Sequence, residues 1–77
     1  MILAVWRSSG GKWKAELDQN SWGFTFVLYE HGRITSFHDL GLGSVEAWDK
    51  VYRLLLNYKR YQGINLIRQK EEVKTSS

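Results

Sequence analysis

The chain has 77 residues, the size of one domain, and it contains no cysteine, so neither a disulfide nor a cysteine-based zinc site can stabilise it. No apolar run approaches the ~20 residues that span a bilayer, and the N-terminal MILAVWR lacks the basic start of a signal peptide. We therefore expect a cytoplasmic protein without a membrane partner, whose core depends on its tryptophan, tyrosine and phenylalanine side chains.

The net charge of +3 is unevenly distributed along the chain. Residues 1–49 carry four lysines and arginines against six carboxylates, whereas residues 50–70 carry six cations and no carboxylate. Positive charge is therefore concentrated in the second half of the chain.

Four runs rich in β-branched and aromatic residues predict β-strands, at residues 2–7, 12–17, 22–30 and 33–39. The connectors SSGG, DQNS and HG have usual hairpin lengths, and His31-Gly32 fits a type I′ turn. These lengths also predict the register of the hairpins. The resulting pairs place Trp6 opposite Trp13, Leu17 opposite Trp22, and Phe26 opposite Phe37.

The same register sorts the side chains onto two faces, because neighbours along a strand point to opposite sides of a sheet. The face expected to form the core collects Ile2, Ala4, Trp6, Trp13, Ala15, Leu17, Trp22, Phe24, Phe26, Leu28 and Phe37. The outer face collects Leu3, Val5, Arg7, Lys12, Lys14, Glu16, Thr25, Val27, Tyr29, Ile34, Ser36 and His38. The gathering of the aromatic residues on one side favours this register.

The stretch DLGLGS breaks the strand pattern, and Ser44 is expected to be the N-cap of a helix over about 44–62 that ends before Gly63. The apolar spacing of this helix predicts that it covers the aromatic face of the sheet. The stripe consists of Val45, Trp48, Val51, Tyr52, Leu55 and Tyr58, with Ala47, Leu54 and Tyr61 beside it.

The sequence thus predicts an α+β fold, in which a four-stranded antiparallel meander packs against one long C-terminal helix. Residues 64–68 fit a short fifth strand or, alternatively, a continuation of the helix. We expect a single domain over residues 1–69 and a flexible C-terminal tail over residues 70–77.

No pattern of catalytic, metal-binding or cofactor-binding residues is apparent. His31 lies at a predicted hairpin tip, and His38 and Asp39 point to opposite faces of one strand. There is no nucleophile with a nearby base and no phosphate-binding glycine loop. We therefore expect a protein that is not an enzyme and has no cofactor.

Surplus apolar surface favours a protein that binds another protein. On a helical wheel Leu56 lies opposite the core stripe, between Arg53 and Arg60, a composition typical of protein interfaces. Apolar residues on the outer sheet face would also need a cover. The leading hypothesis is a small adaptor or inhibitor that acts through protein contacts and forms a homodimer.

The alternative hypothesis is binding of single-stranded nucleic acid. Arg7, Lys12 and Lys14 surround the first hairpin and share the outer face with Tyr29, which supplies cations for phosphates and a ring for a base. Lys59 and Arg60 at the helix end would add to the positive charge.

The predicted order of elements over residues 2–62 is similar to that of the Whirly and PUR-repeat families, in which a four-stranded meander precedes a helix. This resemblance implies binding of single-stranded nucleic acid. It concerns the order of elements and includes no shared motif, so it assigns no functional residue.

Overall fold

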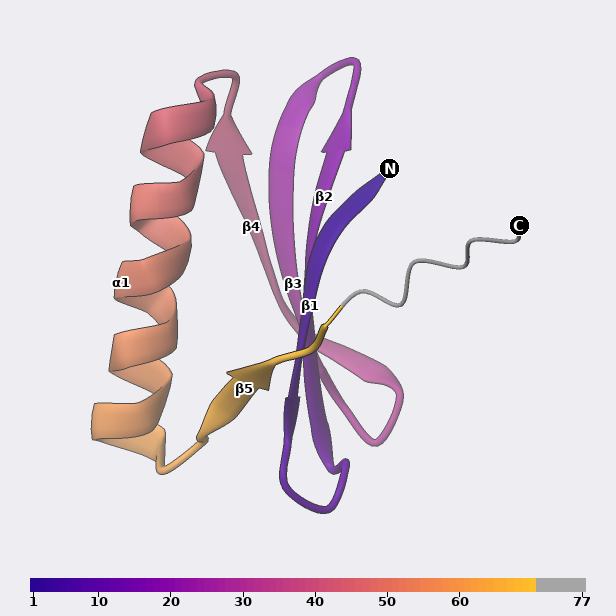
Figure 1. Cartoon of the computed structure of the whole chain (residues 1–77), viewed down its shortest axis with the longest axis vertical. Helices are drawn as coiled ribbons and strands as arrows, with labels where there is room; N and C mark the ends of the chain where they lie inside the picture. Colours follow the sequence, from indigo (N-terminus) through magenta and orange to yellow (C-terminus); the bar gives the residue numbers. More distant parts are fainter. Residues whose placement is uncertain (71–77) are drawn as a thin grey trace.

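The computed structural model describes residues 1–70, and the predicted flexible tail lies outside the described residues from residue 71 onward. The α+β prediction is confirmed, including the fifth strand and the helix over residues 44–62 (Figure 1). The elements are β1 (Ile2–Ser8), β2 (Trp13–Asn20), β3 (Gly23–Glu30), β4 (Arg33–Gly41), α1 (Ser44–Gln62) and β5 (Leu66–Arg68).

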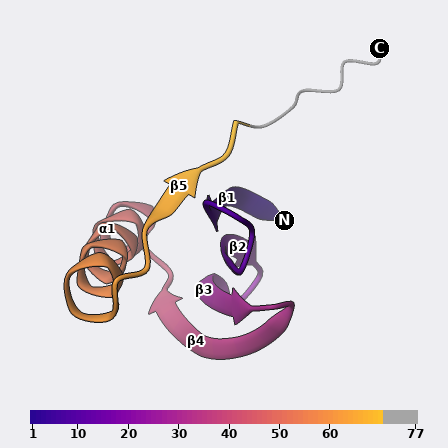
Figure 2. The ribbon, with the colours of Figure 1, turned by 90° about the horizontal axis from the view of Figure 1, so that it is seen from below.

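The five strands form one antiparallel sheet in the order β4-β3-β2-β1-β5. The short strand β5 follows the helix and pairs with the edge of β1 within the same chain. Seen from below, the sheet is strongly curled, and α1 lies along its open side close to β5 and to the end of β4 (Figure 2). The helix therefore closes a half-open sheet.

The core lies between the concave face of the sheet and α1. Its central aromatic residue is Trp6, whose ring meets Phe26 edge-on at 5.5 Å between centroids and Trp48 of the helix at 6.3 Å. The buried cluster comprises Ala4, Trp6, Ala15, Leu17, Phe24, Phe26, Leu28, Leu40, Ala47, Val51, Tyr58 and Ile64.

The predicted register of the first two hairpins is wrong by an even number of residues. Trp6 pairs with Ala15 instead of Trp13, a shift of two, and Leu17 pairs with Phe26 instead of Trp22, a shift of four. Even shifts keep each side chain on its predicted face, because the side-chain period of a strand is two. The exception is Trp22, which lies in the turn between β2 and β3 and is exposed.

The predicted pairing of Phe26 with Phe37 is also wrong, and here the side of the sheet changes. A β-bulge between Ile34 and Ser36 adds one residue to β4, so that Phe37 pairs with Val27. Phe37 therefore lies on the outer face and is 61% exposed. The same bulge turns Ser36 and His38 from the predicted outer face toward the helix side.

A second bulge has the same effect near the start of β1. Ile2 pairs with Asp18 and Ala4 with Leu17, so Leu3 is the additional residue. Leu3 consequently packs against the core, whereas Ile2 is exposed. This is the reverse of the faces predicted for these two residues.

The helix ends differ in how well the sequence predicts them. The N-cap is Gly43 rather than Ser44, and no side chain caps the first turn. Gly63 is the left-handed C-cap residue, as predicted, with a φ of 68°. The amide of Ile64 then donates to the carbonyl of Tyr58 at 3.1 Å, which closes the end of the helix.

The helix buries a narrower stripe than its apolar spacing predicts. Its buried residues are Ala47, Val51 and Tyr58, with Trp48, Leu54 and Leu55 partly buried. Three residues of the predicted stripe are instead exposed: Val45, Tyr52 and Tyr61. One curled sheet and one helix leave the flanks of that helix uncovered.

Two glycines with positive φ provide a matched test of the turns. A Cβ at Gly23 (φ 129°) would lie 2.4 Å from the carbonyl oxygen of Gly41, whereas a Cβ at Gly32 (φ 82°) would meet no atom within 4 Å. We expect Gly32→Ala to cost about 1–2 kcal/mol through backbone strain alone. Gly23→Ala should lower the free energy of unfolding further, because the backbone at Gly41 must also move to make room for the new Cβ. Urea unfolding of both variants measures the difference. Equal losses would contradict this account of the β2–β3 turn.

Candidate functional site

The described residues offer little for catalysis. Among residues 1–70 no group of three His, Asp or Glu side chains converges as a metal site requires. His31 occupies the hairpin tip with a φ of 51°, and His38 Nε2 lies 3.3 Å from the Tyr58 hydroxyl beneath the helix. None of the helices in this part of the chain is both long and apolar enough to cross a membrane.

One end of the molecule carries three large apolar side chains that are almost fully exposed. Trp22 is 85% exposed, Leu42 76% and Val45 79%. They come from the β2–β3 turn, the β4–α1 connection and the first turn of α1, which lie at the same end of the structure (Figure 1). We call Trp22, Leu42 and Val45 the apolar end.

Local backbone geometry explains why Trp22 points away from the core. Its amide donates to Oδ1 of Asn20 at 2.8 Å, which closes a two-residue turn, and Asn20 pairs with Gly23. Gly23 lies so close to Gly41 and Leu42 that the turn packs directly on the β4–α1 connection. Trp22 and Leu42 are therefore presented together.

Two carboxylates lie near the apolar end. The Asp39 carboxylate accepts a bond from the amide of Gly41 at 3.1 Å, beside Leu42. Glu46 lies in the first turn of α1, where the helix dipole favours a carboxylate. One cation lies close to them, since Lys50 Nζ is 3.5 Å from the carbonyl of Leu40. We call Asp39 and Glu46 the acidic border.

The opposite end contains the β1–β2 and β3–β4 hairpin tips and the C-terminal turn of α1 (Figure 1). The two tips are joined by a hydrogen bond from the amide of His31 to the carbonyl of Lys12, 2.8 Å long. Cations dominate this end. They are Arg7, Lys12, Lys14, Arg33, Lys59 and Arg60, with Glu30 among them.

Several of these cations already have partners within the chain. Lys12 Nζ lies 3.4 Å from Oε2 of Glu30 and 5.6 Å from the ring of Trp13. Arg7, Lys14 and Tyr29 lie on the outer face, as predicted, and the observed register, which differs from the predicted one, aligns them in one row across β1, β2 and β3. The register thus brings these three candidate residues together.

Within that row, Lys14 and Tyr29 are tied to Glu16. Lys14 Nζ lies 3.2 Å from Oε2 of Glu16 and 4.9 Å from the centre of the Tyr29 ring. The Tyr29 hydroxyl donates to Oε1 of Glu16 at 3.3 Å. Burial, followed by the Glu16 charge, raises the pKa of Tyr29 above 10.0. The Lys14 ammonium thus lies over the Tyr29 ring, and both side chains bond Glu16. These contacts make the ring less available for stacking with a base and the ammonium less available to a phosphate.

The helical candidates lie on the other layer of the molecule. Leu56 is 56% exposed, and Arg53 beside it forms an ion pair with Asp49 at 3.1 Å. Lys59 and Arg60 are exposed in the last turn of α1. Because α1 covers the concave face, these residues do not join the Arg7–Lys14–Tyr29 row on the outer face. The predicted basic groups thus form two separate patches.

The sequence did not indicate the apolar end. The apolar alternation of residues 22–30 predicts Trp22 as a core residue, and the sequence predicts the four-residue loop DQNS where the structure has a turn between Asn20 and Gly23. Leu42 falls in the predicted connection between the last strand of the meander and the helix. The exposure of Trp22 could have been suspected from the Asn before it and the Gly after it.

Comparison of the chain with protein-family models, with curated proteins and with solved structures gives no match. The similarity to the Whirly and PUR-repeat families thus remains one of element order alone. The function has to be inferred from the surface of the molecule itself.

Burial raises the pKa of Tyr58 above 10.0, and a hydrogen bond with Ser36 opposes that shift. A tyrosine whose pKa is raised in the folded state leaves stability intact below pH 10.0 and lowers it as the pH rises further. We expect the free energy of unfolding to fall as the pH rises above about 10. Tyr58→Phe should reduce that fall, whereas Tyr61→Phe at an exposed site should not. Urea unfolding at several pH values measures this, and equal pH dependence in both variants would contradict it.

Proposed function

We propose that the chain is a small, non-catalytic protein-binding domain that contacts its partner through the apolar end. The observation that carries the proposal is the exposure of Trp22, at 85%, together with that of Leu42 and Val45. Tryptophan residues that a partner buries contribute disproportionately to protein binding. A monomer gains nothing from exposing three such groups at one end of the molecule.

The flank of α1 extends this surface. The prediction that Leu56 lies opposite the core stripe is wrong with respect to Val45 and Tyr52, because the spacing of these three residues places them on one side of α1. All three are exposed. Arg53 and Arg60 flank Leu56 on the same helix. The predicted patch of Arg53, Leu56 and Arg60 therefore continues the apolar end along the helix, and we include it in the proposed contact surface.

The acidic border defines the kind of partner. Asp39 and Glu46 beside the apolar end repel phosphates, which disfavours nucleic acid and anionic lipid at this site. A two-fold contact between apolar ends would bring the same carboxylates together. A homodimer fits better on the outer sheet face, where Ile34 and Phe37 are exposed. We propose that the apolar end binds a different protein with cations around an apolar socket.

Binding of single-stranded nucleic acid is the second candidate, and the cations at the hairpin end favour it. Against it stand the ion pairs of Lys12 and Lys14, and the occupation of the Tyr29 ring by Lys14. Phosphate binding requires cations that are free to release counterions. This candidate therefore has less support than the protein-binding one.

Site-specific photo-crosslinking tests the protein-binding proposal. A photoreactive amino acid replaces Trp22 in one variant and the exposed Ser9, at the opposite end, in another, in cells that produce the protein. We expect a discrete adduct with another protein from position 22 and none from position 9. An adduct only from position 9, or none from either, would contradict the proposal, and an adduct with a second copy of the chain would make the apolar end a dimer contact.

Fluorescence anisotropy of a labelled single-stranded oligonucleotide, titrated at low and near-physiological salt, tests the second candidate. We expect binding at low salt only, with no change on Tyr29→Ala, because Lys14 already occupies that ring. Tyr61→Ala, at an exposed position on α1, is the matched control. Binding that persists at the higher salt and is lost specifically on Tyr29→Ala would favour nucleic acid over protein.

A further inference from the structure

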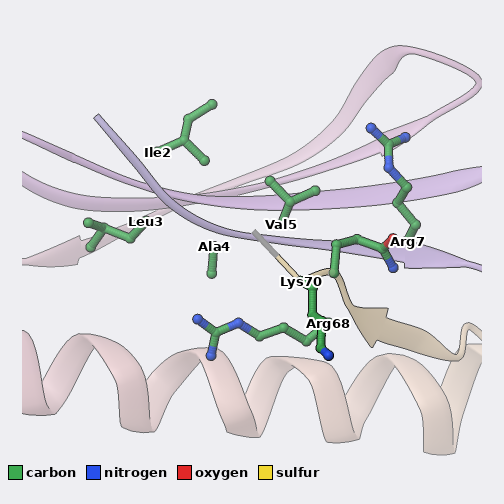
Figure 3. A pocket seen from close by; sticks show the side chains of 8 residues that line it. Ile2, Leu3, Ala4, Val5, Arg7, Arg68 and Lys70 are labelled. Carbon is green, nitrogen blue, oxygen red and sulfur yellow. The ribbon is translucent and has the colours of Figure 1, made fainter. Parts of the chain in front are cut away.

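A groove runs along the start of β1, beside the end of β5 (Figure 3). It encloses a hollow of about 260 Å³. Its apolar wall is the strand segment 2–5, and its remaining lining residues come from the end of β5 and the residues after it. These are Arg68, Gln69 and Lys70, together with Arg7 of β1.

The backbone of β1 is unpaired along this groove in the described part of the chain. The ladder between β1 and β5 ends where Trp6 pairs with Arg68, and one further bond joins the amide of Gln69 to the carbonyl of Val5 at 2.8 Å. Residues 2–4 have no neighbouring strand on that side within residues 1–70. An edge of this kind pairs with an extended peptide through backbone hydrogen bonds.

The groove is positively charged. Its lining contains Arg7, Arg68 and Lys70 and no carboxylate. Among residues 1–70 none of these three cations forms an ion pair. An extended segment entering the groove would therefore meet three cations that have no ion-pair partner among residues 1–70.

Arg68 differs from Arg7 and Lys70 in that its guanidinium lies near two aromatic rings. Its guanidinium carbon lies 5.8 Å from the ring centre of Trp6 and 5.2 Å from that of Trp48. Figure 3 shows its side chain between β1 and the helix, on the same side of β1 as Ala4, whereas Val5 and Arg7 point to the other side. Two indoles thus hold the planar donor group in place without using its N–H donors, which suits a carboxylate.

We propose that this groove binds an extended acidic segment of a partner protein, which adds to β1 as a strand beyond β5 and places a carboxylate on Arg68. This site is separate from the apolar end and goes beyond the function proposed above. About three residues of a peptide fit beside residues 2–4, at ~3.3 Å per residue, because the carbonyl of Val5 already accepts the amide of Gln69. Alternate side chains of that peptide would point toward Arg68, and those between them toward the outer face.

The pairing requirement selects a peptide over other anionic ligands. A nucleic acid has the charge for Arg68 but lacks the alternating N–H and C=O groups that a strand edge needs. A second copy of the chain that used its own β1 edge would bring two positively charged grooves together. An acidic peptide satisfies both the edge and the cations.

The test uses the full chain and a fluorescent peptide of alternating glutamate and valine, with a peptide of alternating glutamine and valine as the neutral control. Anisotropy should show binding of the glutamate peptide only. Arg68→Gln should weaken it about tenfold, since a bidentate charged contact is lost. Arg60→Gln, the same change at the exposed helix end, should alter it less than about twofold. Arg68→Lys, which keeps the charge and loses the fork, should bind with intermediate affinity.

Two further measurements keep the outcome interpretable. Thermal unfolding of Arg68→Gln shows whether the variant still folds, and amide chemical shifts of residues 2–5 in the unaltered chain report strand addition directly. Equal losses in Arg60→Gln and Arg68→Gln, absence of binding, or unperturbed shifts at residues 2–5 would overturn the proposal. Binding seen only in the double variant E71Q/E72Q would also overturn it, in favour of the chain's own residues 71–77. Trp22→Ala should leave peptide binding unchanged, which separates this site from the apolar end.

Discussion

The rest of the structure depends on the contacts of Trp6. This side chain of β1 is buried, meets Phe26 of β3 edge-on, and packs against Trp48 of α1, while Arg68 of β5 lies over both indoles. One side chain thus joins elements that are distant in the sequence. In a chain without cysteine, a contact between large aromatic residues is the strongest available substitute for a covalent link. It also fixes β5, whose three residues could not hold a strand position alone.

The curl of the sheet decides which apolar residues remain exposed. Each bulge leaves one residue of β1 or β4 without a cross-strand partner. The strand bends at that residue, and both strands thereby curve around the helix. A concave sheet encloses only a narrow stripe of a single helix, so Ala47 and Val51 are buried while Tyr52 is exposed. The apolar surface of α1 is therefore a geometric consequence of a one-helix, one-sheet design, and a partner can use it without any cost to the core.

The sequence predicted the elements well because hydrophobic period identifies strands and helices without needing exact pairing. Register errors of two and four residues left most side chains on the predicted face of the sheet, because side chains alternate between faces with a period of two. Prediction failed where a single extra residue entered a strand: the bulge before Ser36 moved Phe37 outward and His38 inward, and the bulge at Leu3 exchanged its face with that of Ile2. The alternation of apolar and polar residues cannot reveal such a residue. A bulge reverses the alternation, and in the sequence this reversal looks the same as one strand ending and another beginning.

The candidate binding residues show a second limit of prediction from sequence. A count of lysines and arginines overstates the charge available to a ligand, because some of them form ion pairs within the chain. Lys14 and Glu16 are two residues apart on one strand face, so their pairing could have been foreseen, whereas the Lys12–Glu30 pair depends on the register of β2 with β3. The sequence predicts Arg68 only as one of six cations within residues 50–70, in the possible fifth strand 64–68. Its position over two indoles follows from the pairing of a three-residue strand with β1, which no local pattern encodes. What distinguishes Arg68 from the other cations is therefore its place beside two indoles and next to a part of the β1 edge that pairs with no strand among residues 1–70, and the proposed peptide carboxylate rests on these two properties.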